Sequence, residues 1–240
     1  MTNDAPRSRG FFAPHRQVFG PAVLRRLRAS FYELTAGSSQ DATSERELRA
    51  MARGEGSDTL RLRQRWFDVW RTPSPDLLEM VRPFTWVIFP PQVRHVSSTS
   101  HFVPWHQDTA YISLLGPLRH TRIVTCHIPL DDEPARRSTL QFTRAPQSEL
   151  THQPRDGFAA GLDIAPEDVV HFELSLGDCL FFGDHAVHRT YTPPGALIDR
   201  RSLEFRLIDP EDSIANKDYF DIELGTFRRR DGPMPEKLPL

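Results

Sequence analysis

The four consecutive residues Trp105-His106-Gln107-Asp108 contain two side chains whose types and spacing suit metal chemistry. If this stretch is a strand, His106 and Asp108 project from the same side of it, because side chains alternate along a strand. A neutral imidazole nitrogen and a carboxylate are two of the three ligands of a 2-His-1-carboxylate site, which leaves coordination positions of iron(II) open. The pair therefore predicts part of a metal site that needs a second histidine from elsewhere in the chain.

The second histidine is expected in the stretch 176–188, where a Gly-Asp turn is followed by an apolar strand. His185 and His188 are the two candidates. On a regular strand they would face opposite sides, so only one of them could point toward the metal. We prefer His188, because it follows Ala186-Val187 in a strand-like segment, whereas His185 lies in a predicted turn.

Another polar pattern follows the histidines, with Arg200, Ser202, Glu204 and Arg206 on one face of a predicted strand. A charged face that points into a protein interior is unfavourable unless it binds something. A guanidinium near an iron site would suit the distal carboxylate of a dicarboxylate, and Ser202 could add a hydrogen bond. The alternative is a charged edge strand that faces solvent. The pattern also leaves open whether Arg200 or the adjacent Arg201 is the anchor.

The elements that must position these residues come as helices first and strands after. Helices are predicted at 21–36, 44–54, 60–71 and 74–82, from N-terminal signals such as Pro21 and Ser74-Pro75 and from stops at Gly37 and Pro83. Strands are predicted from β-branched and alternating runs at 84–89, 93–102, 122–128, 138–143, 169–174, 179–182, 186–191 and 202–208.

This order predicts an α+β fold: a double-stranded β-helix, which is a jelly-roll, cupin-like barrel, with N-terminal helices packed on one sheet. We expect a single domain over 1–240, with a mainly helical part at 1–83, the jelly-roll core at 84–208 and a C-terminal tail at 209–240. The tail is expected to wrap the surface or fray, and residues 1–20 are expected to form a loose arm.

Composition narrows the class of protein. The formal net charge of −2 argues against a broad nucleic-acid or membrane surface. Cys126 and Cys179 lie in apolar runs, so a disulfide framework is not expected and a reducing cytoplasm fits. The N-terminus lacks the apolar core of a signal peptide, and no run approaches membrane-spanning length. We therefore expect a cytoplasmic protein that binds a small molecule and neither nucleic acid nor membrane; the sequence predicts no oligomeric state.

Taken together, the motifs resemble the phytanoyl-CoA dioxygenase-like family of iron(II)- and 2-oxoglutarate-dependent oxygenases. The matching stretches are His106-Gln107-Asp108 with Tyr111, 122–128 with Leu130-Asp131-Asp132, Gly177-Asp178 with Phe181-Phe182 and His188, and Arg200-Arg201-Ser202. The resemblance covers roughly residues 84–208. The chain departs from the family pattern at 144–148, where a Pro-Gly-Ser-His turn is usual, and at 189–193, where a Gly-Ser-Gly-x-Asn run is usual.

The resemblance implies that His106, Asp108 and His188 bind iron(II). It also implies that Arg200 binds the 5-carboxylate of 2-oxoglutarate, with Ser202 and Arg206 as neighbours.

Other side chains could complete the pocket. His127 would lie on a barrel strand beside the cosubstrate, or be a buried core histidine. Trp105 and Tyr111 could line the substrate pocket or pack in the core. Arg119 and Arg122 could contact an anionic substrate or belong to a solvated loop.

The implied reaction uses dioxygen to hydroxylate an unactivated C–H bond of a small molecule, with release of succinate and carbon dioxide. Desaturation, epoxidation or cyclisation are related outcomes, and a natural-product intermediate is the expected kind of substrate. The carboxylate at Asp108 favours oxygen transfer over halogenation, because related halogenases have a small residue there. Two alternatives remain: a cupin-like metal enzyme that does not use 2-oxoglutarate, and a non-catalytic jelly-roll binding protein.

Overall fold

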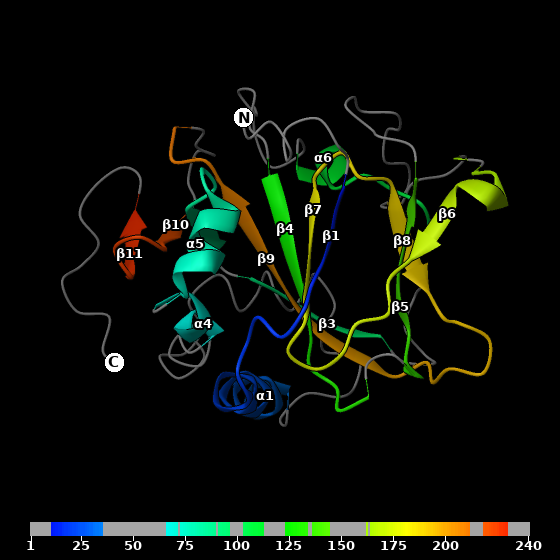
Figure 1. The fold of residues 1–240 in the computed structure, drawn as a ribbon, viewed down its shortest axis with the longest axis horizontal. Coiled ribbons are helices and arrows are strands. Elements are labelled where there is room, and N and C mark those ends of the chain that lie inside the picture. The colour runs from blue at the N-terminus through cyan, green and yellow to red at the C-terminus, as the bar shows by residue number, and fades with distance from the viewer. Residues whose placement is uncertain are drawn as a thin grey trace.

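A large antiparallel sheet forms the centre of the fold (Figure 1). The computed structural model describes residues 11–35, 66–71, 73–89, 91–96, 103–112, 123–133, 136–144, 162, 164–211 and 218–229. The strands of this sheet run in the order β1-β7-β4-β9-β2-β10-β11, and β3 also pairs with β9. They are β1 (Phe11–His15), β2 (Trp86–Phe89), β3 (Gln92–Val96), β4 (Ile123–Pro129), β7 (Cys179–Gly183), β9 (Arg200–Ile208), β10 (Asp218–Asp221) and β11 (Thr226–Arg229).

A smaller sheet lies opposite the large one, on the right in Figure 1. Its strands run in the order β6 (Val169–His171), β5 (Thr139–Thr143) and β8 (His188–Tyr191). An apolar cluster joins the two sheets, made of Leu140, Phe142, Leu174, Leu180, Phe182 and Ala186. Two facing antiparallel sheets with side chains packed between them are the architecture of a jelly roll. The predicted fold is confirmed.

Helices cover the other face of the large sheet. They are α1 (Pro21–Thr35), α4 (Asp68–Arg71) and α5 (Pro75–Val81). Leu27, Trp70 and Val81 bring these three helices into one core with sheet residues such as Phe205. The helices predicted from Pro21 and from Ser74 are confirmed, and the Ser74 side chain caps α5 by accepting from the Leu77 N–H. The helix predicted at 44–54 lies outside the described residues.

Strand β9 separates an apolar face from a polar one. Leu203, Phe205 and Leu207 pack into the helix-covered core. Side chains alternate along a strand, so Arg200, Ser202, Glu204 and Arg206 turn toward the other sheet. Strand β9 pairs with β4 on one side and with β2 and β3 on the other, so it is a central strand. The alternative of a solvent-facing edge strand is therefore wrong.

Two segments that were expected to be irregular are strands. Residues 11–15 form β1, which pairs with β7, so the expectation of a loose N-terminal arm is wrong for this part of the chain. Within the tail, β10 pairs with β2 and β11 pairs with β10, and Tyr219 and Phe220 are fully buried. Both segments are short, and their strand structure depends on a partner that is distant in sequence.

In the described part of the chain, no helix is both long enough and apolar enough to cross a membrane.

Candidate metal centre

The His106-Gln107-Asp108 motif is not on a regular strand. His106 forms an isolated bridge with His188, and Asp108 is the first residue of a short helix, α6 (Asp108–Ile112). The expected strand geometry for the pair is therefore wrong. The two side chains converge because the chain bends between the bridge and the helix.

Backbone hydrogen bonds attach this bend to the segment that leads into β8. His106 and His188 exchange reciprocal N–H···O bonds, each 2.9 Å long. The fully buried Gln107 side chain donates to the His185 carbonyl at 2.8 Å. The Thr109 N–H donates to the Asp184 carbonyl at 3.1 Å, and the Thr109 hydroxyl donates to the Asp184 carboxylate at 2.5 Å. These hydrogen bonds hold His106 and His188 next to each other, although the two residues are far apart in the sequence.

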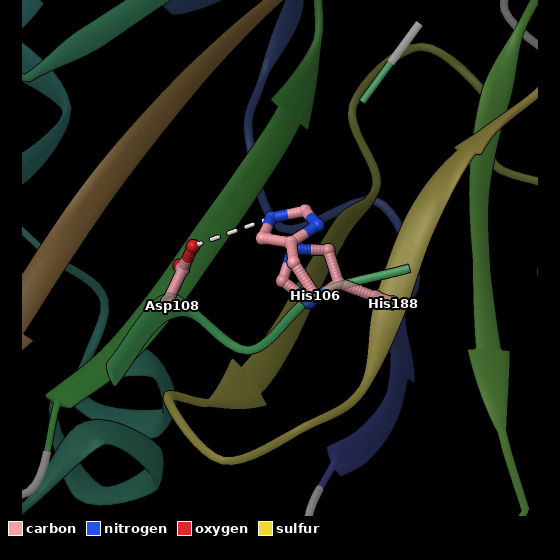
Figure 2. Close-up of side chains that lie close together, drawn as sticks. All are labelled: His106, Asp108 and His188. Atoms are coloured by element: carbon pink, nitrogen blue, oxygen red, sulfur yellow. Dashed lines mark ion pairs between the residues drawn. The ribbon is translucent and has the colours of Figure 1, made fainter. Parts of the chain in front are cut away.

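Three buried side chains meet at this junction (Figure 2). One ligand atom from each of His106, Asp108 and His188 lies within 4.8 Å of the others. The imidazole rings of His106 and His188 are 4.1 Å apart between centroids, and His106 Nε2 is 3.7 Å from Asp108 Oδ1. No other group of three His, Cys, Asp or Glu side chains gathers in this way among the residues that the structure describes.

The two imidazoles are oriented to act as ligands. His106 Nδ1 is 2.8 Å from the Pro104 carbonyl oxygen, and His188 Nδ1 is 2.8 Å from that of Ala186. A carbonyl can only accept, so each Nδ1 carries the proton, and a neutral ring then has its lone pair on Nε2. Burial, followed by the neighbouring His188, lowers the pKa of His106 to about 3. His106 is therefore neutral at physiological pH, which is the form that binds a metal.

Asp108 supplies the negative charge. Burial alone would raise its pKa, but Arg206, His188 and His106 outweigh this effect and lower it. Its Oδ2 accepts a hydrogen bond from the Thr125 hydroxyl at 3.2 Å and lies 3.4 Å from an Arg206 nitrogen. Two imidazole nitrogens and one carboxylate form the donor set that suits iron(II), so the three residues fit this ion.

Aromatic rings from both sheets pack against His188: Phe142 comes from β5 of the small sheet and Phe182 from β7 of the large sheet. Phe142 stacks on His188 with 5.6 Å between ring centroids, and the Phe182 ring is 4.8 Å from that of His188. These contacts restrict rotation of the imidazole and exclude water from one side of it. His185, the other candidate ligand, lies in the turn with its Nδ1 3.2 Å from Asp184 Oδ1, and is not part of the three-residue cluster.

Arg200 is the most unusual polar side chain of the interior. It is 2% exposed, and none of its three guanidinium nitrogens has a hydrogen-bond partner among the described residues. Burial and the nearby Arg94 lower its pKa to about 10, so it remains charged at neutral pH. The fully buried Ser202 hydroxyl, two residues along the same face of β9, also lacks a partner.

Arg201 has a different environment. Its guanidinium contacts Asp131 Oδ1 at 3.2 Å and Asp199 Oδ2 at 2.9 Å. Arg201 therefore has direct ion-pair partners, whereas the Arg200 guanidinium has no hydrogen-bond partner among the described residues.

The predicted residue His127 lies opposite Glu204 in the register of β4 and β9. Its Nδ1 is 3.3 Å from Glu204 Oε1, and both side chains are buried. Burial lowers the pKa of His127. Burial would raise the pKa of Glu204, but Arg94, His127 and Arg206 together lower it, so Glu204 is ionised.

The residues proposed to contact substrate are only partly described. The Trp105 ring packs under the Arg189 guanidinium, 4.5 Å from ring centroid to guanidinium carbon. The backbone of Tyr111 belongs to α6, but its side chain is not described. Arg119 and Arg122 lie outside the described residues.

Two interior polar residues were not identified from the sequence, Thr125 and Arg94. Thr125 precedes His127 by two positions on β4, so the alternation of that strand places both on one face. Arg94 pairs with Ser202 across β3 and β9, and this contact depends on a strand pairing that the sequence does not specify.

Comparison with known proteins agrees with this architecture. The family model described as phytanoyl-CoA dioxygenase matches residues 7–193, a range that contains the three clustered residues and ends before Arg200. No curated protein matches the chain by sequence.

Solved structures share the fold at low sequence identity. The non-heme monooxygenase ThoJ in its apo form has a TM-score of 0.57 and 15% identity, over 86% of this chain and 76% of its own. The carbocyclase SnoK from nogalamycin biosynthesis has a TM-score of 0.56 and 14% identity, over 90% and 83%. EvdO2 from Micromonospora carbonacea var. aurantiaca, complexed with 2-oxoglutarate, has a TM-score of 0.53 and 18% identity, over 88% and 91%.

The family model covers most of the chain, and the sequence motifs, the two-sheet fold and the buried His-Asp-His cluster agree with it. The chain belongs to the phytanoyl-CoA dioxygenase family.

Proposed function

We propose that the protein is an iron(II)- and 2-oxoglutarate-dependent dioxygenase that hydroxylates a C–H bond of a small molecule. In this proposal His106, Asp108 and His188 hold the metal through two Nε2 atoms and one carboxylate. Iron(II) with 2-oxoglutarate supplies oxidation by dioxygen, with release of succinate and carbon dioxide. The protein supplies the coordination geometry, binds the cosubstrate and excludes water.

The main support for this proposal is the buried Arg200 guanidinium, which has no hydrogen-bond partner among the described residues. A buried guanidinium without a partner is costly, and a bound carboxylate would offset that cost. Arg206 lies 3.4 Å from Asp108, and Arg94 has a stabilising effect on ionised Glu204. Glu204 and Asp131 also favour the charged form of Arg200, but no described residue forms a hydrogen bond with its guanidinium. Arg200 is thus available for the distal carboxylate of 2-oxoglutarate, with Ser202 as a second donor. A metal enzyme that does not use this cosubstrate has no need for such a charge.

The kind of substrate follows by extension from the structural neighbours. ThoJ is described as a monooxygenase and SnoK as a carbocyclase from nogalamycin biosynthesis, so one fold supports several reaction outcomes. By analogy, we propose that the substrate of this chain is a small molecule of natural-product size and that the reaction is hydroxylation. Asp108 supports oxygen transfer, because a carboxylate occupies the coordination position that a halide would need.

The test compares Arg200→Met with Arg201→Met in anaerobic titrations of 2-oxoglutarate into the iron(II)-loaded protein. The readout is the visible charge-transfer band of the complex. We expect Arg200→Met to weaken 2-oxoglutarate binding by about 30-fold or more, because truncating one partner of a buried charge pair costs about 2 kcal/mol or more. Arg201→Met should bind within about threefold of the wild type, because the Arg201 guanidinium is already engaged by Asp131 and Asp199 and would not contact the cosubstrate.

Two results would contradict the proposal. If wild-type protein with iron(II) and 2-oxoglutarate develops no charge-transfer band, the cosubstrate assignment is wrong and an enzyme of the cupin type without 2-oxoglutarate is favoured. If Arg201→Met has the larger effect, the anchor has been assigned to the wrong residue. Screening small molecules for stimulated succinate release, with mass spectrometry of the products, then identifies the substrate and the reaction outcome.

A further inference from the structure

The two oxygens of the Asp108 carboxylate have different environments. Oδ1 is the oxygen that faces the cluster, 3.7 Å from His106 Nε2. Oδ2 accepts a hydrogen bond from Thr125 Oγ1 at 3.2 Å and lies 3.4 Å from an Arg206 nitrogen. The Thr125 side chain is fully buried, and the Arg206 side chain is 20% exposed. One oxygen is therefore held by the protein, and the other points toward the histidines.

The residues that contact Oδ2 belong to two central strands of the large sheet. Thr125 on β4 and Arg206 on β9 are direct cross-strand partners in the register of the large sheet. Strands β4 and β9 are both central in that sheet. Asp108 lies outside the sheet, at the start of the five-residue helix α6. The large sheet thus contacts the Asp108 carboxylate, whereas the backbone of Asp108 belongs only to a short helix.

We propose that Thr125 and Arg206 are positioning residues that hold Asp108 Oδ2 and leave Oδ1 as the single oxygen presented to the metal. This inference rests on the proposed function, but its test requires only that the cluster bind a divalent metal ion. A carboxylate that binds through one oxygen occupies one coordination position, whereas binding through both would occupy two. The chelating cosubstrate and dioxygen together need three open positions on a six-coordinate ion, which requires the first arrangement.

A simpler reading is that Arg206 is only a nearby positive charge. The two readings predict opposite signs for the same substitution. A cation close to the site repels a divalent metal, so removing it would tighten metal binding. If Arg206 instead fixes the carboxylate, its removal weakens metal binding, because residues that orient a ligand typically contribute 10–100-fold in metal affinity. Thr125 gives an independent comparison, because it can be changed without altering any charge.

The experiment measures Co(II) affinity by calorimetry in the full-length protein without 2-oxoglutarate. Thr125→Val removes the hydroxyl at similar volume, Thr125→Ser restores it, Arg206→Met removes the guanidinium and Arg206→Lys keeps the charge. Arg201→Met, five positions before Arg206 on the same strand, is the matched control, because the Arg201 guanidinium contacts Asp131 and Asp199 and not Asp108. We expect about tenfold weaker Co(II) binding for Thr125→Val and for Arg206→Met, with Thr125→Ser and Arg201→Met within about twofold of the wild type.

The visible absorption of bound Co(II) adds a second readout, because its intensity changes with coordination number. We expect the spectrum to change in Thr125→Val and to return to that of the wild type in Thr125→Ser. Wild-type affinity in Thr125→Val, or tighter binding in Arg206→Met, would overturn the positioning role. If Arg206→Met does not fold, Arg206→Lys and the Thr125 pair decide the question. Wild-type protein that binds no Co(II) would instead remove the proposed metal site, and with it the ligand that Thr125 and Arg206 position.

Discussion

At the scale of single residues, Arg200 is unfavourable for the stability of the ligand-free protein but is required by the proposed function. Its charge is buried, its guanidinium has no hydrogen-bond partner among the described residues, and Arg94 is close enough to lower its pKa. Interactions of this kind oppose folding of the ligand-free protein. They become favourable only when an anion enters, which is the behaviour expected of a binding residue rather than of a structural one.

Because the buried charge of Arg200 opposes folding when no anion is bound, we predict that Arg200→Met stabilises the ligand-free protein. Replacing a buried guanidinium that has no hydrogen-bond partner with an apolar side chain of similar length removes its desolvation cost. Replacement of whole buried ion pairs by apolar residues is often stabilising by about 1–4 kcal/mol, and we expect a gain at the lower end of this range. Thermal or urea unfolding of metal-free protein should therefore give a higher midpoint for Arg200→Met than for the wild type. Addition of iron(II) and 2-oxoglutarate under anaerobic conditions should raise the midpoint of the wild type and have a smaller effect on the variant. A lower midpoint for ligand-free Arg200→Met would mean that Arg200 has a structural role.

The sequence was most informative about residue types and least informative about local conformation. His106, Asp108 and His188 were selected as a set, and the structure brings these three together. The reason given for their convergence was nevertheless wrong, because Asp108 starts a helix instead of continuing a strand. The alternation of side chains predicts which way a residue points only inside a regular strand. The bend at His106–Asp108 is instead stabilised by non-local contacts of Gln107 and Asp184.

At the scale of elements, β1 is attached to the turn before β7 by one carboxylate. The side chain of Asp178 is completely buried and accepts from the backbone N–H groups of Gln17 at 2.9 Å and Ser175 at 2.7 Å, and from Arg16 at 2.6 Å. Burial would raise the pKa of Asp178, but these donors outweigh it and lower the pKa. The adjacent Gly177 has a φ of 101° and approaches the Phe19 carbonyl closely, which favours glycine at this position.

Asp178→Asn should destabilise the protein by about 1–3 kcal/mol at pH 7, because it leaves a buried donor or acceptor unsatisfied. Because the pKa of Asp178 is lower in the folded state, its ionised form contributes stability above the unfolded-state pKa of about 3.9. That contribution is lost as the pH falls through the folded-state pKa. Urea unfolding should therefore show a gap between wild type and variant that is constant near neutral pH and narrows below about pH 4. Glu167→Gln, on an exposed turn, is the control, and a gap that does not depend on pH would contradict the assigned ionisation.

The strands that were missed share a physical cause. Strand β1 contains a proline, and β10 lies in a charged, proline-rich tail, so neither has a strong local preference for strand structure. They are stabilised by pairing with β7 and β2 and by burial of Tyr219 and Phe220. Local patterns could predict the central strands β4, β7 and β9, whose apolar faces are strongly marked, but not partners supplied by the tertiary fold.

At the scale of the whole molecule, the metal centre lies where the two sheets approach each other. His188 belongs to the small sheet, whereas Thr125 and Arg206, which contact Asp108, belong to the large one. A bound ion would link these parts through side chains. Because such an ion binds the folded state alone, it stabilises that state by about 2.7 kcal/mol at a concentration one hundred times its Kd.

We expect Co(II) to raise the unfolding midpoint of the wild type and to slow amide hydrogen exchange in β5 and β8. His188→Ala should abolish both effects. His185→Ala should retain them, because His185 lies in the turn outside the cluster. If His185→Ala abolished the response and His188→Ala did not, the third ligand would have been assigned to the wrong histidine.

The reciprocal backbone bridge between His106 and His188 has a consequence for how the site assembles. Two main-chain hydrogen bonds join His106 to His188, and each imidazole Nδ1 donates to a carbonyl, so the relative position of the two rings is set before any ion binds. Asp108 reaches the pair from a separate short helix. The three ligand side chains therefore depend on two separate restraints, the backbone bridge for the histidines and the contacts of Thr125 and Arg206 for the carboxylate. Substitutions at Thr125 and Arg206 should then change the position of the carboxylate and leave the paired histidines in place.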